Sequence, residues 1–279
     1  MTAFLLYSAL AVAAAATPGV SAAEALKSAD AYYARRAEGQ VNGVARTEMV
    51  DNAIDEYRRS LTLDPSSYDA RLGLLRSFFF RGGFCNMEEK AQIALFDEAK
   101  KFAEETVRKL DLDLARRKGR VKMSAVKDEV PSAQIYMWAA VSWGQWAVSH
   151  RVSAAFQGGP ARIRDLASAA IQIDPATEQA GGLAVLGRLH RECPKILFLT
   201  GWVSRSEGLR LLRRALATAS QNPANKYFLA EALLAESPSQ AAEARRLLEE
   251  IAHLSTRPEY LVEDAHYAAE ARDLLATIR

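Results

Sequence analysis

The sequence predicts an all-α fold, a solenoid of about eleven helices arranged in antiparallel pairs. Three observations lead to this prediction. The 279 residues include only 9 prolines and 15 glycines, a low content of the residues that interrupt helices. Apolar residues recur at three- and four-residue steps, which places them on one face of a helix. Several prolines follow helix-capping residues, and no run of alternating β-branched residues typical of a strand occurs.

Composition and length restrict the class of protein. Hydrophobic residues make up 49% of the chain and charged residues 25%, which disfavours both a disordered chain and a multi-span membrane protein. The length suits one large domain or two small ones. The formal net charge of +2 lacks the basic excess of a nucleic-acid-binding protein, so we expect no nucleic-acid partner.

The N-terminal segment is typical of a secretory signal peptide. Residues 1–23 contain no charged side chain, and Phe4–Ala16 is an apolar run of 13 residues, too short to span a bilayer comfortably. Small residues follow it at the spacing that a signal peptidase recognises, which predicts cleavage after Ala22 or Ala23. We therefore expect a signal peptide over 1–23 and a periplasmic or secreted domain over 24–279. The alternative is a buried N-terminal helix of the mature fold.

Cys85 and Cys193 are the two cysteines of the chain. In an oxidising compartment they could form one disulfide, and two separately buried thiols are the alternative. Neither lies in a CxxC pair, so the sequence supports neither redox catalysis nor a structural zinc site. No cysteine directly follows the signal segment, so no stable membrane anchor is indicated.

Capping residues mark where helices are expected to begin. A cap followed by proline at the first helical position predicts a helix start, because that N–H would lack a partner anyway. The pattern occurs at Asp64-Pro65, Asp174-Pro175, Asn222-Pro223 and Ser237-Pro238. Ser204 and Glu207 add a capping-box pattern before another helical segment.

Small residues and an aromatic residue at fixed spacing indicate helical repeats. Ala53, Tyr57, Ser60 and Pro65 occur in AIDEYRRSLTLDP, where the small side chains permit close helix approach and the aromatic one fills the gap between pairs. This is the pattern of tetratricopeptide (TPR) repeats. Looser copies contain Ala99 and Ala103, Ala167 and Ala170, Leu212 and Ala215, and Ala244 and Leu248. The period is irregular, so we expect divergent repeats with an insertion near 110–130; a generic helical bundle is the alternative.

Three segments of the C-terminal half carry a resemblance to a known family. They are LASAAIQIDP, LAVLGRLHRECP and GWVSRSEGLRLLRRALATASQNPANKYFLAEALL. Over roughly residues 130–255, this order resembles the T-component family of TRAP (tripartite ATP-independent periplasmic) transporters, which are secreted TPR-like helical proteins. The resemblance implies a periplasmic scaffold that associates with an extracytoplasmic solute-binding protein or with copies of itself. Lipoprotein members carry a cysteine after the signal peptide, and this chain has none.

The sequence contains no recognisable catalytic or metal-binding motif. His150, His190, His253 and His266 do not have the spacing of zinc ligands. GxSxG, P-loop and GxGxxG motifs do not occur. We therefore expect a protein that is not an enzyme and that needs no cofactor or metal.

An aromatic stretch supplies the candidate binding residues. In YMWAAVSWGQW, residues 136–146, helical geometry places Tyr136 and Trp143 on one line and Trp138 and Trp146 on another. One line must face the core, and the other would border the concave surface of the solenoid; the alternative is a helix buried all round. The full set of partner- or ligand-groove candidates is Tyr136, Trp138, Trp143, Trp146, Phe78, Phe79, Phe80 and Trp202.

These observations lead to one principal hypothesis and two alternatives. The principal one is a secreted, non-enzymatic scaffold that binds a protein partner within a TRAP-type solute-uptake system, with homo-oligomerisation open. The first alternative is a periplasmic carrier of an apolar small molecule in an aromatic-lined groove. The second is an enzyme with an unrecognised carboxylate site.

Overall fold

The computed structural model describes residues 20–117 and 130–278. Residues 1–19 of the predicted signal peptide and most of the insertion expected near 110–130 lie outside this range. The described residues form twelve α-helices and no strand, which confirms the all-α prediction. Two isolated β-bridges occur, Val41 with Val44 and Ala45 with Cys85.

The helices follow one another along the chain. In chain order they are α1 (Ala22–Ala34), α2 (Glu48–Leu63), α3 (Tyr68–Phe84), α4 (Glu89–Arg117), α6 (Ser132–Ser149), α7 (Arg151–Phe156), α8 (Gly159–Ile173), α9 (Thr177–Glu192), α10 (Arg205–Thr218), α11 (Pro223–Glu236), α12 (Ala241–Ala252) and α13 (Leu261–Thr277). Two 3-10 turns, Pro238–Gln240 and Pro258–Tyr260, precede the last two helices.

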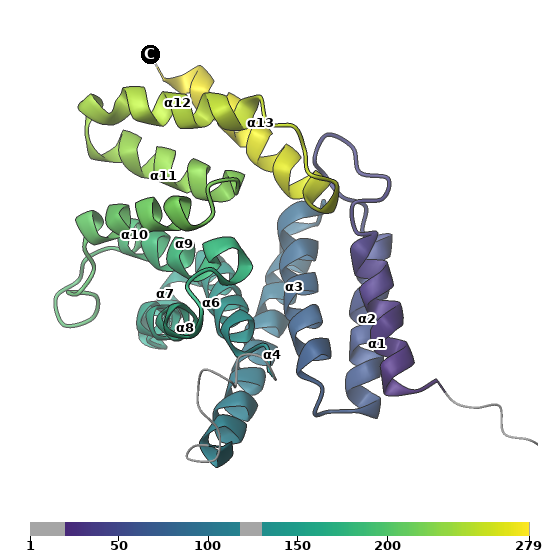
Figure 1. Ribbon diagram of the computed structural model, residues 1–279. Helices are drawn as coiled ribbons and strands as arrows, with labels where there is room; N and C mark the ends of the chain where they lie inside the picture. Colours follow the sequence, from purple (N-terminus) through teal and green to yellow (C-terminus); the bar gives the residue numbers. More distant parts are fainter. Residues whose placement is uncertain (1–19, 118–129, 279) are drawn as a thin grey trace, which may run out of the picture.

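The helices pack as successive pairs (Figure 1). The pairs are α1 with α2, α3 with α4, α6 with α8, α9 with α10, and α11 with α12, while α13 covers the last pair and α7 connects α6 to α8. The small residues predicted to permit close approach are buried on the second helix of each pair. They are Ala53, Ala99, Ala103, Ala167, Ala170, Ala215 and Ala244.

The predicted repeat motif on α2 makes the contacts that its residue types imply. Tyr57 is buried, and its hydroxyl donates to Asp30 of α1 at 2.7 Å. The Ser60 hydroxyl donates to the backbone oxygen of Ala22 at 2.9 Å. Gly73 of α3 lies directly under the Tyr57 ring, so one aromatic side chain joins three helices.

The predicted helix starts have different outcomes. Ser204 and Asn222 cap α10 and α11 with their side chains, and Ser237 caps the 3-10 turn before α12, which confirms these three. The predictions at Asp64 and Asp174 are wrong, because these residues are the C-caps of α2 and α8. Their carboxylates accept the backbone N–H two residues further on, which forms an Asx-turn in place of a helix N-terminus.

The first helix begins close to the predicted cleavage position. Ser21 is the N-cap of α1 and forms a capping box with Glu24. Hydrogen bonds from Ser21 lower the pKa of the Glu24 carboxyl. Cleavage after Ala22 or Ala23 would remove this cap, which contributes about 1 kcal/mol in typical helices.

The core is continuous along the solenoid. Three groups of buried side chains surround Phe78, Leu183 and Leu248. Phe102 packs against both the first and the second group, and Phe228 against both the second and the third. The helix pairs therefore share one apolar interior.

We predict that Gly73→Ala destabilises the fold. The added methyl group would fall on the Tyr57 ring, and such overpacking typically costs about 1–3 kcal/mol. The measurement is the free energy of unfolding in urea.

Gly83→Ala is the matched control on the same helix. The nearest atom to its new Cβ is Phe79 Cε2 at 3.9 Å, so alanine should raise stability by about 0.5–1 kcal/mol through helix propensity. Equal effects of the two substitutions would contradict the proposed role of the Tyr57–Gly73 contact.

Candidate functional site

The first helix of each pair contributes to one continuous inner layer. Helices α1, α3, α6, α9, α11 and α13 contact one another in this order, and α13 also contacts α3. The second helices pack mainly on their own partners and on the helix that follows them. The first helices therefore lie on the inside of the curve, and we call their solvent-facing surface the inner face.

A chain of ring contacts lies at the inner face and in the core directly beneath it, where Phe80 and Phe84 are buried. Its members are Tyr33, Phe79, Phe80, Phe84, Trp138, Tyr227, Phe228, His266 and Tyr267. The centroids of Phe79 and Trp138 are 5.2 Å apart, and those of Phe84 and His266 are 5.3 Å apart. We call this set the aromatic chain. It connects α3 with α6 and with α13, so residues from both ends of the protein meet in it.

A buried ion pair closes the solenoid next to the aromatic chain. The Arg36 guanidinium lies 2.8 Å from the Glu263 carboxylate and donates to the backbone oxygen of Glu259 at 2.6 Å. Its carbon lies 4.8 Å from the centroid of the Tyr33 ring and 5.2 Å from that of Phe80. These contacts fix α13 against the segment that follows α1.

A second buried carboxylate holds the start of α13. Asp264 is fully buried and accepts the Arg257 backbone N–H at 2.8 Å and its guanidinium at 2.6 Å. The same guanidinium donates to Gln179 of α9 at 3.0 Å. This arrangement connects the segment before α13 to the first turn of α9.

The first turn of α9 has an unusual backbone. Glu178, Gln179 and Ala180 have positive φ angles of 48°, 54° and 65°, which side chains with a Cβ rarely adopt. Glu178 pairs with Arg76 of α3, and the Gln179 backbone oxygen accepts the Asn225 amide at 3.0 Å. Contacts from α3, α11 and the segment before α13 thus hold this left-handed turn at the inner face.

Charged groups accompany the aromatic chain on α9, α11 and α13. Glu231 is open to solvent, and partial desolvation by surrounding protein atoms raises the pKa of its carboxyl. Burial raises the pKa of Tyr267 to about 12. The Arg188 guanidinium lies 4.3 Å from the centroid of Phe228. The inner face therefore presents half-buried rings next to charges of both signs.

The structure places only part of the predicted candidate set on this face. Phe79 and Trp138 are half-buried and in contact there. Four candidates are buried in the core, out of reach of a ligand: Phe78, Phe80, Trp143 and Trp146. Of these, Trp143 and Trp146 pack under Lys100 of α4. Whether Phe79 and Trp138 bind a partner stays a prediction.

The last two candidates lie elsewhere. Tyr136 is half-buried and donates to Asp111 of α4. Trp202 lies in the loop between α9 and α10, where the Arg164 guanidinium covers its ring at 4.7 Å. Sequence reasoning missed Tyr227, Phe228 and Tyr267, although the adjacent aromatic pair 227–228 at a helix start was a usable signal.

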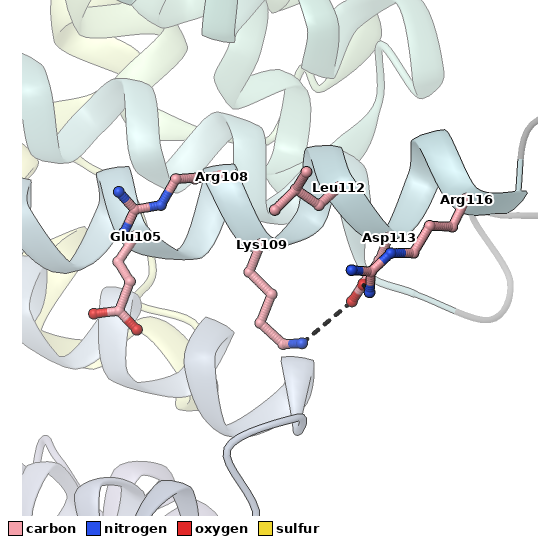
Figure 2. A pocket seen from close by; sticks show the side chains of 6 residues that line it. All are labelled: Glu105, Arg108, Lys109, Leu112, Asp113 and Arg116. Carbon is pink, nitrogen blue, oxygen red and sulfur yellow. Dashed lines mark hydrogen bonds and ion pairs between the residues drawn. The ribbon is translucent and has the colours of Figure 1, made fainter.

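The outer surface of α4 has a shallow depression near the start of α3. It measures about 300 Å³, and its lining residues are Glu105, Arg108, Lys109, Leu112, Asp113 and Arg116 (Figure 2). The Asp113 carboxylate forms ion pairs with Lys109 at 3.3 Å and with Arg116 at 3.4 Å. The Tyr68 hydroxyl donates to Asp113 at 2.6 Å, and this hydrogen bond lowers the pKa of the carboxyl.

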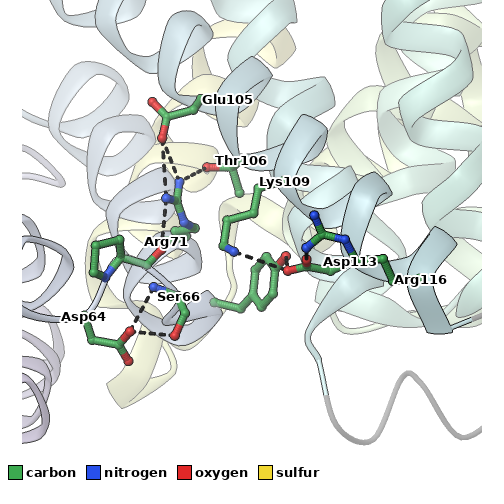
Figure 3. Close-up of polar contacts among 10 residues, drawn as sticks. Asp64, Ser66, Arg71, Glu105, Thr106, Lys109, Asp113 and Arg116 are labelled. Carbon is green, nitrogen blue, oxygen red and sulfur yellow. Dashed lines mark hydrogen bonds and ion pairs between the residues drawn. The ribbon is translucent and has the colours of Figure 1, made fainter.

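The neighbouring contacts explain this depression as part of the α3–α4 junction. Buried Arg71 donates to Thr106 at 3.2 Å and to the Pro65 backbone oxygen at 3.2 Å (Figure 3). Its guanidinium also lies 3.4 Å from Glu105. These hydrogen bonds and ion pairs join α4 to α3 and to the segment before it, so they stabilise the α3–α4 junction.

A second depression of about 370 Å³ lies between α2 and α4. Ile54, Met87 and Leu95 contribute apolar side chains to it. Two ion pairs border it, Arg58 with Glu98 at 2.6 Å and Arg81 with Asp51 at 2.7 Å.

Both cysteines are free thiols in the structure. Cys85 is buried, and burial raises the pKa of its thiol to about 11. Desolvation also raises the pKa of the Cys193 thiol. Neither is therefore an activated nucleophile at neutral pH.

Two further kinds of feature are absent from the part of the chain that the structure describes. In residues 20–117 and 130–278, no group of three or more His, Cys, Asp or Glu side chains is arranged to hold a metal ion. Among the helices of the same ranges, none is long and apolar enough to cross a membrane.

We predict that Glu263→Gln opens the closure of the solenoid and lowers the free energy of unfolding by about 2–3 kcal/mol. The substitution leaves the largely buried Arg36 guanidinium without its carboxylate. Glu38→Gln, in the exposed Arg35–Glu38 pair at 2.7 Å, is the control and should change stability by under about 1 kcal/mol. Similar losses in the two variants, measured by urea unfolding, would refute the closure role.

We predict that acidification destabilises the protein through His266. Burial against Phe84 and Tyr267 lowers the pKa of His266, although Glu270 opposes the shift. On acidification, His266 therefore takes up a proton in the unfolded chain before it does so in the folded protein. The contribution of neutral His266 to stability is fully present above about pH 6.5 and is lost as the pH falls toward its lowered pKa in the folded protein. His266→Phe keeps the ring and should reduce this loss in urea titrations between about pH 7 and pH 5; an unchanged pH dependence would contradict the assignment.

Comparisons with known proteins agree with the architecture. No family model matches the chain, and no curated protein matches it. Among solved structures, the chain is similar to a thermophilic TPR protein from Thermus thermophilus, with a TM-score of 0.54 and 15% sequence identity. The alignment covers 92% of this chain and 98% of that one. At this identity the likeness shows the fold alone: the chain is an all-α, TPR-like solenoid.

Proposed function

We propose that this protein is a secreted, non-enzymatic scaffold that binds a protein partner on its inner face. The observation that carries the proposal is the aromatic chain, in which half-buried rings of α3, α6, α11 and α13 lie beside charged groups. Aromatic and arginine side chains are the residues that contribute most at protein interfaces. Their arrangement along an inner layer suits an extended or helical protein segment.

The chemistry of the inner face also favours a partner with both apolar and charged groups. Glu231 and Glu270 offer carboxylates, while Arg188 offers a guanidinium stacked on Phe228. A partner segment with an apolar anchor and a nearby cation could therefore contact the rings and Glu231 together. The net charge is only +2, so the protein has no strong overall electrostatic field that would attract a partner. Recognition would therefore depend on the side chains of the inner face.

We further propose that the partner belongs to a TRAP-type solute-uptake system and that the protein acts in the periplasm. Two sequence features support this proposal: the resemblance over residues 130–255 and the charge-free segment 1–23. The partner that these features favour is an extracytoplasmic solute-binding protein. The TPR-like fold is compatible with such a role and with other partners.

We predict that Glu231→Lys weakens binding of the solute-binding protein of the same organism by at least about tenfold. The substitution reverses one charge of the inner face at an exposed position, so the fold should persist. The measurement is the dissociation constant from calorimetric titration. Glu249→Lys makes the same change at an exposed position on α12 and should leave affinity unchanged.

The experiment distinguishes an incorrect binding surface from an incorrect partner. Equal losses in both variants would show that binding does not use the inner face. Absence of any binding by the unsubstituted protein would overturn the TRAP assignment and leave the scaffold proposal to other partners.

A carrier of an apolar small molecule is the second candidate. The contact between half-buried Phe79 and Trp138 favours it, because two rings 5.2 Å apart offer an apolar surface. A lipophilic ligand at this position would change the tryptophan emission, and Trp138→Phe would remove that change.

A further inference from the structure

The loop between α9 and α10 presents apolar side chains to solvent. Ile196, Leu197, Phe198 and Leu199 are 44%, 74%, 95% and 60% exposed. Figure 1 shows this loop projecting away from the helix pairs beside α10. Four consecutive exposed apolar residues are unusual, since scattered single ones are the norm on a protein surface.

The loop is a constructed turn. The Thr200 hydroxyl accepts the Ile196 backbone N–H at 2.8 Å, and Thr200 itself is buried. The Leu199 and Thr200 N–H groups both donate to the Ile196 backbone oxygen, at 3.2 and 2.8 Å. Phe198 has a φ of 69°, a conformation that costs an L-residue free energy. These hydrogen bonds hold the turn, which leaves its apolar side chains exposed.

The base of the loop is fixed to the rest of the solenoid. Trp202 stacks beneath Arg164 of α8 and lies edge-on to His190 of α9, with ring centroids 5.3 Å apart. His190 accepts the Ser204 backbone N–H at 3.1 Å. These contacts fix the base of the loop and hold its apolar tip, residues 196–199, away from the core.

The unpaired charged side chains on either side of the tip, residues 196–199, are positive. Residues 196–204 contain no charged side chain, whereas residues 188–210 contain five Lys or Arg and two Glu, a net charge of +3. Three of the cations are already paired, Arg188 with Glu192, Arg191 with Glu236 and Arg210 with Glu207, each at 2.6 Å. Lys195 and Arg205, on either side of the tip, have no ion-pair partner among the described residues and are exposed.

We propose that this loop inserts into an anionic lipid surface and attaches the protein peripherally to a membrane. The projecting shape suits a bilayer, because a convex tip buries its side chains in lipid without a preformed pocket. Leu197 and Phe198 would reach the boundary between headgroups and acyl chains, where apolar side chains are stabilised. Lys195 and Arg205 would then lie at the level of the anionic headgroups.

The first test reports insertion at the tip itself. In the full chain, Phe198→Trp should show an additional emission that shifts to the blue with phosphatidylcholine–phosphatidylglycerol vesicles and is quenched by brominated acyl chains. Phe156→Trp is the matched control, because Phe156 of α7 is 89% exposed. Absence of quenching at position 198, or equal quenching at both positions, would overturn the proposal.

The second test measures the contribution of the tip to binding. Leu197→Ser with Phe198→Ser should weaken vesicle partitioning of the full chain at least about tenfold. Leu63→Ser with Phe156→Ser removes the same two side-chain types at other exposed positions and should leave partitioning unchanged. Equal partitioning of both double variants contradicts the proposal, because the rest of the chain then accounts for binding.

Lipid composition and self-association provide the remaining comparisons. Vesicles of phosphatidylcholine alone should bind more weakly, and added salt should reduce the advantage of phosphatidylglycerol. Self-association that is lost in the Leu197→Ser, Phe198→Ser variant, together with absence of vesicle binding, would assign the loop to an interface between copies of the chain and refute the membrane proposal.

Discussion

Close approach of neighbouring helices at small residues is the constraint on which the rest of this structure depends. Gly73 admits the Tyr57 ring between α2 and α3. Gly187 and Gly208 face each other across α9 and α10, where a Cβ on Gly208 would come within 2.8 Å of the Gly187 backbone oxygen. Side chains at these positions would move the neighbouring helices apart, both within a pair and between pairs. Because each pair sets the direction of the next, such changes would accumulate along the solenoid.

The cumulative curvature brings the two ends of the protein together. Arg36 follows α1, and Glu263 lies in the last helix, 227 residues away, yet they form a largely buried ion pair. Repeat proteins often depend on contacts between neighbouring pairs alone. Here the contact of α13 with α3 and the Arg36–Glu263 pair couple the first and last elements, so the inner face has a fixed geometry.

The inner face and the loop before α10 differ in their physical character. On the inner face, half-buried aromatic rings pack against one another and lie beside charged groups. In the loop, Leu197 and Phe198 are exposed, and Phe198 has a left-handed backbone conformation. The inner face is formed by the packing of successive helix pairs, whereas the exposed loop is formed by a local turn.

The sequence by itself determined the helical class, the pairing and the small residues buried on the second helix of each pair, although not the glycines at the closest helix contacts. Ala53, Tyr57 and Ser60 have roles that follow from spacing alone, because helical periodicity is a local property. Asp64 and Asp174 show the limit even at this level, since an aspartate before proline can end one helix as readily as begin the next. The TPR-like order of the pairs was predictable for the same local reason.

Only the tertiary structure decided which aromatic residues lie on a surface. Trp138 and Trp146 share a helix and a predicted line, yet Trp138 meets Phe79 at the inner face whereas Trp146 is buried against α4. Tyr227 and Tyr267 come together from separate helices, and no spacing in the sequence encodes that meeting. The relative positions of these residues depend on how every helix pair between them is rotated against the next. That rotation is set by tertiary packing, and no local sequence pattern reveals it.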